Sequence, residues 1–164
     1  MYTKSEWGGR PSLNHTRPLT HPTEYVLISH TASQFCETFA TCSTKMQQMQ
    51  SQHVSEFNSP DIGYNFVIGG DAGIYVGRGW DIRNFHTDRN IGISFIGNFV
   101  YDYLTVEMIE ALKEVLELGV KLDKLWANYK LICHNQTSNT LSPGEHVYME
   151  ISKLPHFYDG VITI

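Results

Sequence analysis

The chain has 164 residues, a net charge of -5 at pH 7, 41% hydrophobic residues and 18% charged residues. This composition excludes a disordered chain, and the length fits a single domain over residues 1–164. No basic run is present, which argues against nucleic-acid partners and anionic membrane surfaces. The longest apolar stretch, residues 91–100, is interrupted and far too short to cross a bilayer, so we expect no direct membrane insertion by this segment.

The first half of the chain predicts an extended segment, a strand, a helix and a hairpin. Prolines punctuate residues 1–24, which we expect to be extended, and residues 25–28 form a β-rich apolar run typical of a buried strand. A helix is predicted from about Cys36 to Phe57, and its face at spacings of three and four carries Met46, Met49, His53 and Phe57. Residues 65–69 and 74–77 predict a hairpin around a glycine-rich turn.

The second half adds two strands and two helices. Residues 91–96 and 129–133 are apolar and predict interior strands. Thr105 is a candidate cap for a long helix, whose predicted apolar stripe consists of Val106, Ile109, Leu112, Leu116 and Val120. Ser142-Pro143 has the pattern of an N-cap and first residue for a last helix that ends before Pro155. Strands interleaved with three helices predict an α/β or α+β fold with a mixed sheet covered by helices.

Cysteine spacing and glycosylation motifs favour an oxidising, extracellular setting. Cys36 and Cys42 are close enough in sequence for a disulfide that closes a small loop, while Cys133 would remain a buried thiol. Two Asn-x-Thr sequons begin at Asn14 and Asn135 and predict glycosylation. We therefore expect a secreted protein or the ectodomain of a membrane protein.

Several strings of residues are too specific to be generic. They are, in chain order, SEWGGR (5–10), ISHTA (28–32), DIGYNFVIGGD (61–71), VGRGW (76–80), IGISFIGNF (91–99) and SPG (142–144). Together they resemble the peptidoglycan recognition proteins of animal innate immunity, from about residue 5 to Phe157. The resemblance implies an amidase-like fold with a central mixed sheet flanked by three helices, a disulfide between Cys36 and Cys42, and a cleft for bacterial muropeptide.

The resemblance also implies where a zinc amidase of this family would hold its metal. Catalytic zinc needs several strong protein ligands and an open position for water. The three matching positions here are Ser29, His134 and Ser142, and neutral hydroxyls are poor replacements for imidazole and thiolate. We therefore expect no metal, no cofactor and no amidase activity. A serine nucleophile assisted by His134 is also disfavoured, because neither serine lies in a Gly-x-Ser-x-Gly elbow.

Loss of zinc leaves binding open, since a cleft can recognise sugar and peptide by hydrogen bonds and stacking. By resemblance, the groove-lining positions are His30, Thr31, His53, Tyr64, Arg78, Trp80 and His86. An arginine at the Arg78 position goes with diaminopimelate-type stem peptides in this family, and guanidinium pairs well with the extra carboxylate of that residue. From the residues alone, six of the seven have a structural alternative. His30 and Thr31 would be polar residues at a strand end, His53 and Tyr64 core residues, Trp80 a packing residue and Arg78 an exposed arginine without a partner.

Two departures from the family pattern support a different function. Residues 58–60 lack the aromatic residue that usually precedes the DIGY string, and the loop between His86 and Ile91 is a few residues shorter than the family norm. Both changes would make the groove shallower. The leading hypothesis, from the family resemblance and the arginine at position 78, is a non-catalytic receptor domain that binds diaminopimelate-type muropeptide. The alternative is a decoy domain that has lost this binding and regulates signalling by pairing with related peptidoglycan receptors.

Overall fold

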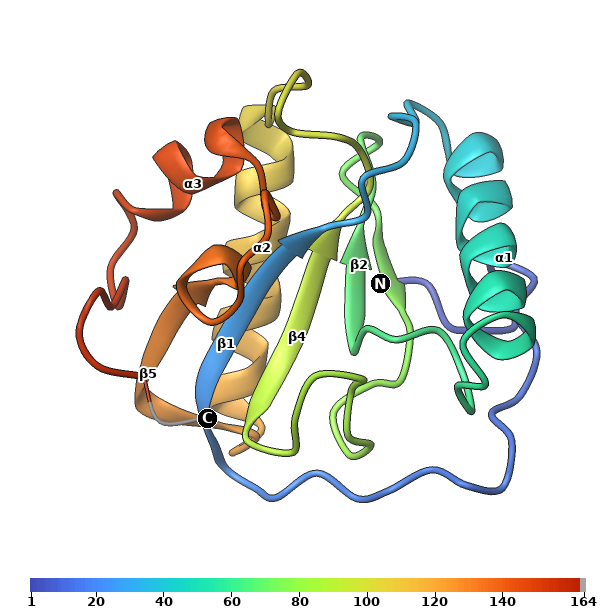
Figure 1. Ribbon diagram of the computed structural model, residues 1–164, viewed down its shortest axis with the longest axis horizontal. Coiled ribbons are helices and arrows are strands. Elements are labelled where there is room, and N and C mark those ends of the chain that lie inside the picture. Colours follow the sequence, from blue (N-terminus) through green and yellow to red (C-terminus); the bar gives the residue numbers. More distant parts are fainter. Residues whose placement is uncertain (163–164) are drawn as a thin grey trace.

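Five strands form one mixed sheet in the computed structural model, which describes residues 1–162 (Figure 1). The strands lie in the order β3-β2-β4-β1-β5, and β3 is antiparallel to β2 whereas the other neighbours are parallel. Their bounds are β1 Thr23–His30, β2 Phe66–Ile68, β3 Ile74–Val76, β4 Asn90–Phe95 and β5 Leu125–Cys133. The mixed sheet confirms the predicted fold class.

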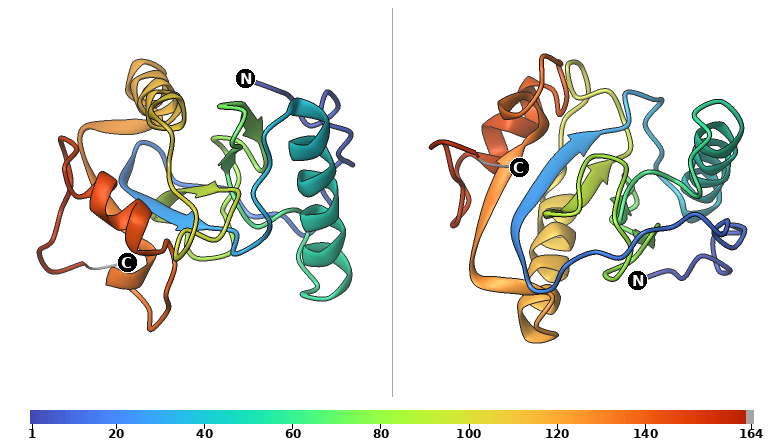
Figure 2. Two further views of the ribbon diagram at one scale, coloured as in Figure 1. Left: turned by 90° about the horizontal axis from the view of Figure 1, so that it is seen from above. Right: turned by 60° about the horizontal axis from the view of Figure 1, so that its bottom comes forward.

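Three α-helices of the described chain pack around this sheet (Figure 2). They are α1 (Phe39–Ser55), α2 (Val106–Lys121) and α3 (Glu145–Ile151), and a short 3-10 helix, η1 (His134–Gln136), follows β5. α2 covers one face of the sheet, and buried residues of α3 join the same core cluster. α1 lies at the β2–β3 end, where its buried residues pack against Val67 and Tyr75.

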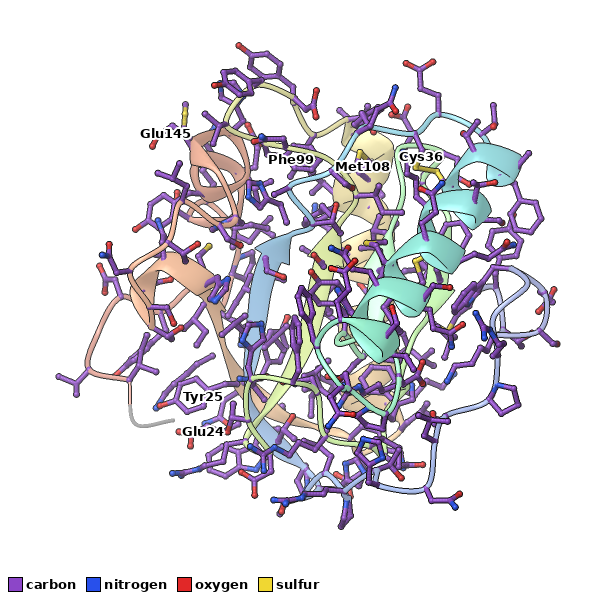
Figure 3. The ribbon with its side chains drawn as sticks, turned by 45° about the vertical axis from the view of Figure 1, so that its right-hand side comes forward. Glu24, Tyr25, Cys36, Phe99, Met108 and Glu145 are labelled. Carbon is purple, nitrogen blue, oxygen red and sulfur yellow. A yellow bond between two sulfur atoms is a disulfide. The ribbon has the colours of Figure 1, made fainter. Side chains whose placement is uncertain are left out.

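Alternation of side chains across β1 separates the two faces of the sheet. Val26 and Ile28 belong to the core cluster beneath α2, so Leu27 and Ser29 point to the opposite face. On that face Leu27 is covered by the C-terminal segment, with which it forms a separate small cluster. The part of this face at the carboxyl ends of β1 and β4 is where the candidate site lies. Figure 3 shows Phe99 near this end of the molecule and Tyr25 near the other.

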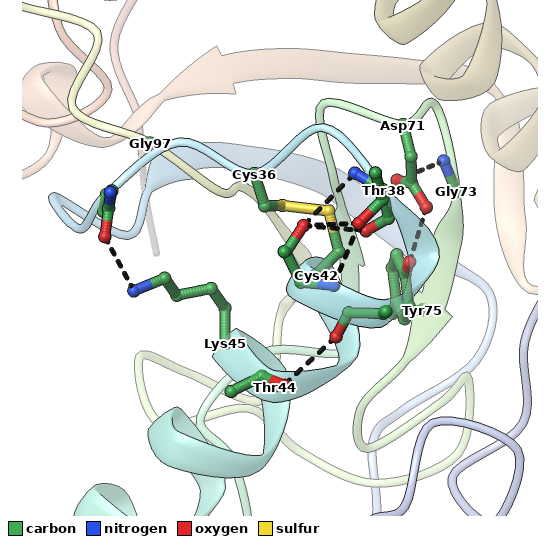
Figure 4. The surroundings of a disulfide bond; sticks show 12 residues. Cys36, Thr38, Cys42, Thr44, Lys45, Asp71, Gly73, Tyr75 and Gly97 are labelled. Carbon is green, nitrogen blue, oxygen red and sulfur yellow. Dashed lines mark hydrogen bonds between the residues drawn. A yellow bond between two sulfur atoms is a disulfide. The ribbon is translucent and has the colours of Figure 1, made fainter.

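The predicted disulfide is present between Cys36 and Cys42, immediately before and inside the first turn of α1 (Figure 4). The helix begins after Thr38, whose hydroxyl accepts a hydrogen bond from the Thr41 amide in a capping box. Cys133 is a free, buried thiol, as predicted, and burial raises its pKa to about 12. The disulfide therefore ties the entry of α1 to the helix itself, and burial makes Cys133 unreactive.

Several element boundaries differ from the prediction. α1 begins at Phe39 and ends at Ser55, so Phe57 lies beyond the helix and is 57% exposed instead of sharing its buried face. Val106, the first residue of α2, is 70% exposed and does not belong to the apolar stripe. The buried residues of α2 are Met108, Ala111, Leu112, Val115, Leu116 and Gly119.

The predicted cap of the last helix is wrong. α3 begins at Glu145, with Gly144 at the N-cap in a positive-φ conformation (87°) that favours glycine. A side chain at Gly144 would also collide with the backbone of Phe99. The Ser142 hydroxyl is used elsewhere, because it accepts a hydrogen bond from the His30 amide at 3.2 Å. Ser142 thus makes a hydrogen bond to β1 and does not cap α3.

Candidate functional site

The candidate site is built on Ser29 of β1 and Ser94 of β4, which are register partners in the parallel sheet. Val67 of β2 continues the same row on the next strand. Open α/β sheets place their ligand sites at the carboxyl ends of the strands, where side chains from neighbouring strands meet. Both serines are nevertheless almost fully buried, with exposed fractions of 3% for Ser29 and 0% for Ser94.

The three positions that correspond to zinc ligands converge at this end of the sheet. β5 ends with Cys133 opposite Ile28, which places His134 in the adjoining η1 segment at the level of Ser29. Ser142 reaches the same strand through its bond to the His30 amide. One imidazole and two neutral hydroxyls do not fit catalytic zinc, which takes three strong protein ligands. Among the described residues, no group of three or more His, Cys, Asp or Glu could hold a metal ion.

Two histidines face each other beside this point. The rings of His86 and His134 meet edge to face, with their centroids 4.6 Å apart. Nε2 of His86 and Nδ1 of His134 are buried and have no hydrogen-bond partner within residues 1–162. Buried polar atoms in folded proteins are nearly always paired with protein, water or ligand. These two nitrogens therefore lack, among the described residues, the partner that buried polar atoms nearly always have.

A cluster of rings continues from His86 along the site. Phe85 packs on His53 (centroids 5.4 Å apart), on Tyr64 (5.2 Å) and on His86 (4.7 Å). His53 comes from the buried face of α1, and its Nδ1 accepts a hydrogen bond from the Gly63 amide at 2.9 Å. The structure thus brings together His53, Tyr64 and His86 of the predicted groove residues.

Burial keeps these imidazoles neutral. Burial lowers the pKa of His53 to about 4, and the nearby positive charge of Arg78 adds to the effect. Burial also lowers the pKa of His86 to about 4 and lowers the pKa of His134. Burial raises the pKa of the Tyr64 phenol. At neutral pH the three imidazoles and the Tyr64 phenol are therefore uncharged, and they can act as hydrogen-bond donors and acceptors.

Phe85 is the site residue that the sequence prediction missed. Its amide donates to the Gly63 carbonyl at 3.0 Å, and its ring lies so close to the Gly63 Cα that an added Cβ would be 2.5 Å from a ring carbon. The preceding Asn84 is buried and anchors the loop, since its side-chain oxygen accepts from the His86 amide at 2.8 Å. The ring therefore packs on both His53 and Tyr64, whose own rings also meet, with centroids 5.7 Å apart. The signal in the sequence that could have pointed to Phe85 is its position as a single apolar residue between Asn84 and His86.

Three other predicted residues lie in different surroundings. His30 alternates with Ser29 and contacts Phe99, whose amide donates to His30 Nδ1 at 3.1 Å. The Thr31 hydroxyl, at the end of β1, accepts from the Gly97 amide at 3.1 Å. Trp80 packs on Phe66 with ring centroids 4.5 Å apart and sits against Gly119 of α2. Of the two roles that the sequence left open for Trp80, these contacts favour packing. A binding role for His30 and Thr31 stays a prediction.

Arg78 lies in a neighbouring pocket, and its guanidinium is held by the protein. Its Nε donates to the Ile62 carbonyl at 2.7 Å, one terminal nitrogen donates to the Arg83 carbonyl at 2.6 Å, and the other donates to the Ser59 hydroxyl at 2.7 Å. The rings of Phe57 and Phe85 line the same pocket. Aromatic side chains are therefore present here, although residues 58–60 supply none.

Comparisons with known proteins identify the family. Residues 19–145 match the family model described as N-acetylmuramoyl-L-alanine amidase. Peptidoglycan-recognition protein SC1a/b of Drosophila simulans is 41% identical over 161 residues, which cover 96% of this chain and 86% of that protein. The chain belongs to the peptidoglycan recognition protein family. Peptidoglycan recognition protein 1 of Mus musculus is 38% identical over 159 residues, covering 94% and 87% of the two chains.

Solved structures of other peptidoglycan recognition proteins have the same fold. The ectodomain complex of peptidoglycan recognition proteins LCa and LCx with tracheal cytotoxin contains a chain with a TM-score of 0.94 and 42% identity, and the match covers 98% of this chain and 100% of that one. Peptidoglycan recognition protein LE in complex with tracheal cytotoxin, described as monomeric diaminopimelic acid-type peptidoglycan, has a TM-score of 0.94 and 37% identity, covering 97% and 96%.

The surface of this peptidoglycan recognition domain presents both sequons. Asn14 and Asn135 are exposed, so each side chain is accessible, and their glycosylation stays a prediction. No helix among the described residues is long and apolar enough to span a bilayer.

Proposed function

We propose that this chain binds diaminopimelate-type muropeptides of the bacterial cell wall without hydrolysing them. The observation that carries the proposal is the pair of buried, unpartnered nitrogens of His86 and His134 within residues 1–162. His86 contacts Phe85, whose ring packs on Tyr64 and His53, and a muropeptide at this end of the sheet would provide amide and hydroxyl groups as partners. The tracheal cytotoxin complexes of the LE and LCa–LCx proteins support this ligand class.

The absence of hydrolysis rests on the chemistry of the ligand positions. Ser29 and Ser142 offer neutral hydroxyls where zinc needs imidazole and thiolate, and the Ser142 hydroxyl already accepts the His30 amide. Tyr64 is buried, and burial raises the pKa of its phenol, so it is a protonated hydrogen-bond donor at neutral pH. A single imidazole, His134, remains of the three ligands. We therefore assign the site to recognition.

The setting of this recognition is extracellular. The Cys36–Cys42 disulfide is of the kind that persists in oxidising compartments, and both sequon asparagines are exposed. The LCa and LCx chains of the similar complex are ectodomains. We place this domain in a secreted protein or in the ectodomain of a receptor, with related peptidoglycan receptors as pairing partners.

Calorimetric titration with a defined monomeric diaminopimelate-type muropeptide tests the proposal. We expect saturable binding of one ligand per chain and no release of the stem peptide after prolonged incubation with zinc. Saturable binding together with amide-bond cleavage would show that the domain is an enzyme. Absence of binding at high ligand concentration would remove the recognition function and leave the second candidate.

The Phe85 ring favours that second candidate, a decoy domain that pairs with related receptors. It packs on both His53 and Tyr64 and so covers side chains that a muropeptide would contact. Its loop is fixed by Asn84, which donates to Asn65 and Asn90 side chains at 2.9 and 2.8 Å. A domain with a filled groove would signal through protein contacts alone. Binding to a related ectodomain that is unchanged by added muropeptide, measured by sedimentation velocity, would support this function.

A further inference from the structure

A buried carboxylate, that of Asp61, joins the N-terminal segment to the candidate site. Asp61 is 0% exposed, and its Oδ2 atom forms an ion pair with the Lys4 ammonium group and accepts the Ser12 hydroxyl at 2.6 Å. Its Oδ1 atom accepts the side-chain amide of Gln50, on α1, at 2.9 Å. The Gln50 side chain also bonds to the backbone amide and carbonyl of Arg10, at 2.8 and 2.7 Å. The residues before β1, which run past α1 in Figure 1, are therefore fixed to the helix and to Asp61 together.

Lys4 supplies the positive charge that compensates the Asp61 carboxylate. A charge that leaves water loses more free energy than hydrogen bonds to neutral groups return, so a buried carboxylate needs a cation beside it. Within residues 1–162, Lys4 is the only lysine, arginine or histidine that forms an ion pair with Asp61. Ser12 accepts from Lys4 at 3.2 Å and donates to Asp61, so the three side chains form one connected network. Removal of the Lys4 charge would leave the buried carboxylate without compensation.

The backbone that follows Asp61 holds two side chains of the site by hydrogen bonds. The Ile62 amide donates to Asp61 Oδ1 at 2.7 Å, and the Ile62 carbonyl accepts from Arg78 Nε at 2.7 Å. The next amide, that of Gly63, donates to His53 Nδ1 at 2.9 Å. A displaced Asp61 carboxylate would move both backbone groups, because they belong to the two residues that directly follow it. The orientation of the His53 ring and of the Arg78 guanidinium therefore depends on where the carboxylate lies.

We propose that Lys4 is a positioning residue for ligand recognition, and that its ion pair with Asp61 sets the backbone of residues 61–64 and hence the shape of the site. This inference rests on the proposed muropeptide recognition and deepens it, because it places control of the site in the N-terminal segment. Lys4 lies 57 positions before Asp61 in the sequence and contributes through the carboxylate, without touching the ligand. A change confined to the residues before β1 therefore alters binding at the far side of α1.

Calorimetric titration of charge variants with the diaminopimelate-type muropeptide provides the first test. We expect Lys4→Met to weaken binding about tenfold or more, because the buried carboxylate loses its cation. The double variant Lys4→Met with Asp61→Asn removes both charges and keeps an acceptor for Gln50, so its affinity should return to within about threefold of the wild type. Lys124→Met is the matched control, since Lys124 pairs at 2.7 Å with the exposed Asp81, and its affinity should not change. Wild-type affinity in Lys4→Met, or no recovery in the double variant, would overturn the proposal.

A second measurement needs no ligand and separates positioning from a general loss of stability. The NMR signals of the Gly63 amide and of Arg78 Nε–H are compared with the amide of Ile132, which is buried in a different cluster. In Lys4→Met we expect the first two signals to shift, the Ile132 signal to stay in place, and the double variant to reverse the shifts. Equal shifts at all three positions, or an unchanged Gly63 signal, would overturn the proposal. If the wild type binds no muropeptide, the proposed recognition is refuted, and these signals still decide whether Lys4 positions the site.

Discussion

Single residues decide whether this site is charged and whether it is open. His53 is 6% exposed, it accepts the Gly63 amide through Nδ1, and Phe85 stacks on its ring. Protonation of His53 would place a charge in a buried site near the positive charge of Arg78. The ring of Phe85 limits the room left beside Tyr64.

The stability of the domain should fall in acid because of His53. Its pKa is about 6.5 in the unfolded chain and about 4 in the fold, so the unfolded chain takes up the proton first. Stability is therefore full above pH 6.5 and is lost as the pH falls toward 4, by about 3 kcal/mol for this residue. Urea unfolding between pH 7 and pH 4 measures the loss. His53→Gln should show a smaller decrease over the same range, and an identical decrease would contradict the assignment to His53.

Removal of the Phe85 ring should open the site. Phe85→Ala deletes the ring that packs on His53, Tyr64 and the Gly63 backbone, so a muropeptide gains the space. We expect the affinity for the diaminopimelate-type muropeptide to rise about tenfold, as the ligand no longer has to displace apolar contacts. Phe39→Ala is the control, because Phe39 is equally exposed (40% against 41%) and packs on Tyr2 and Tyr75 instead. An affinity that stays the same or falls in Phe85→Ala would show that the ring is part of the binding surface.

At the scale of elements, α1 positions His53 and depends on the contacts of its first turn. Its N-cap Thr38 and the Cys36–Cys42 disulfide fix the entry of the helix. Gln50, one turn before His53, donates to the buried carboxylate of Asp61 at 2.9 Å and joins α1 to the segment that leads to Tyr64. This hydrogen bond therefore helps to fix the position of His53, on α1, relative to Tyr64, which follows Asp61.

Loss of the disulfide should destabilise the domain moderately. Cross-linking residues separated by six positions restricts the unfolded chain by about 2 kcal/mol at 25 °C in the chain-entropy estimate. The double variant Cys36→Ser with Cys42→Ser should therefore unfold at a lower urea concentration. Reduced wild-type protein should reproduce the shift, because Cys133 is a free thiol in both forms. An unchanged urea midpoint in the variant would mean that the packing of α1 alone fixes its entry.

At the scale of the whole molecule, the sheet assembles a site from segments far apart in the sequence. Ser29 ends β1, His134 follows β5 and Ser142 precedes α3, yet parallel pairing brings the first two to the same level. The bond from the His30 amide to the Ser142 hydroxyl fixes the third. The fold thus brings the three positions that the resemblance matches to zinc ligands to the same end of the sheet.

Restoring those two side chains should restore metal binding. Ser29→His with Ser142→Cys adds an imidazole and a thiolate beside His134, which gives the ligand number and types that zinc prefers. We expect one zinc per chain by elemental analysis and thiolate-to-metal absorption with cobalt. Adding His134→Ala to this variant should abolish both signals. Zinc content no higher than in the wild type, in a variant with wild-type circular dichroism, would show that the three positions do not converge as described.

The sequence by itself determined the fold class and the family, and it has serine at two of the three positions that the resemblance matches to zinc ligands. Apolar runs with strand or helix periods reflect local burial, and residue identities at Ser29 and Ser142 need no coordinates to exclude strong ligands. It also indicated the Cys36–Cys42 disulfide, which short spacing makes accessible.

Only the tertiary structure decided which of the predicted groove residues share a site. Trp80 packs against Phe66 and Gly119 because the approach of α2 is set by long-range packing, which no local pattern records. The same holds for Phe85, whose place over Gly63 depends on a loop anchored by Asn84 to β2 and β4. Whether Arg78 has free donors depends on carbonyl groups of Ile62 and Arg83, and backbone acceptors are invisible in a sequence.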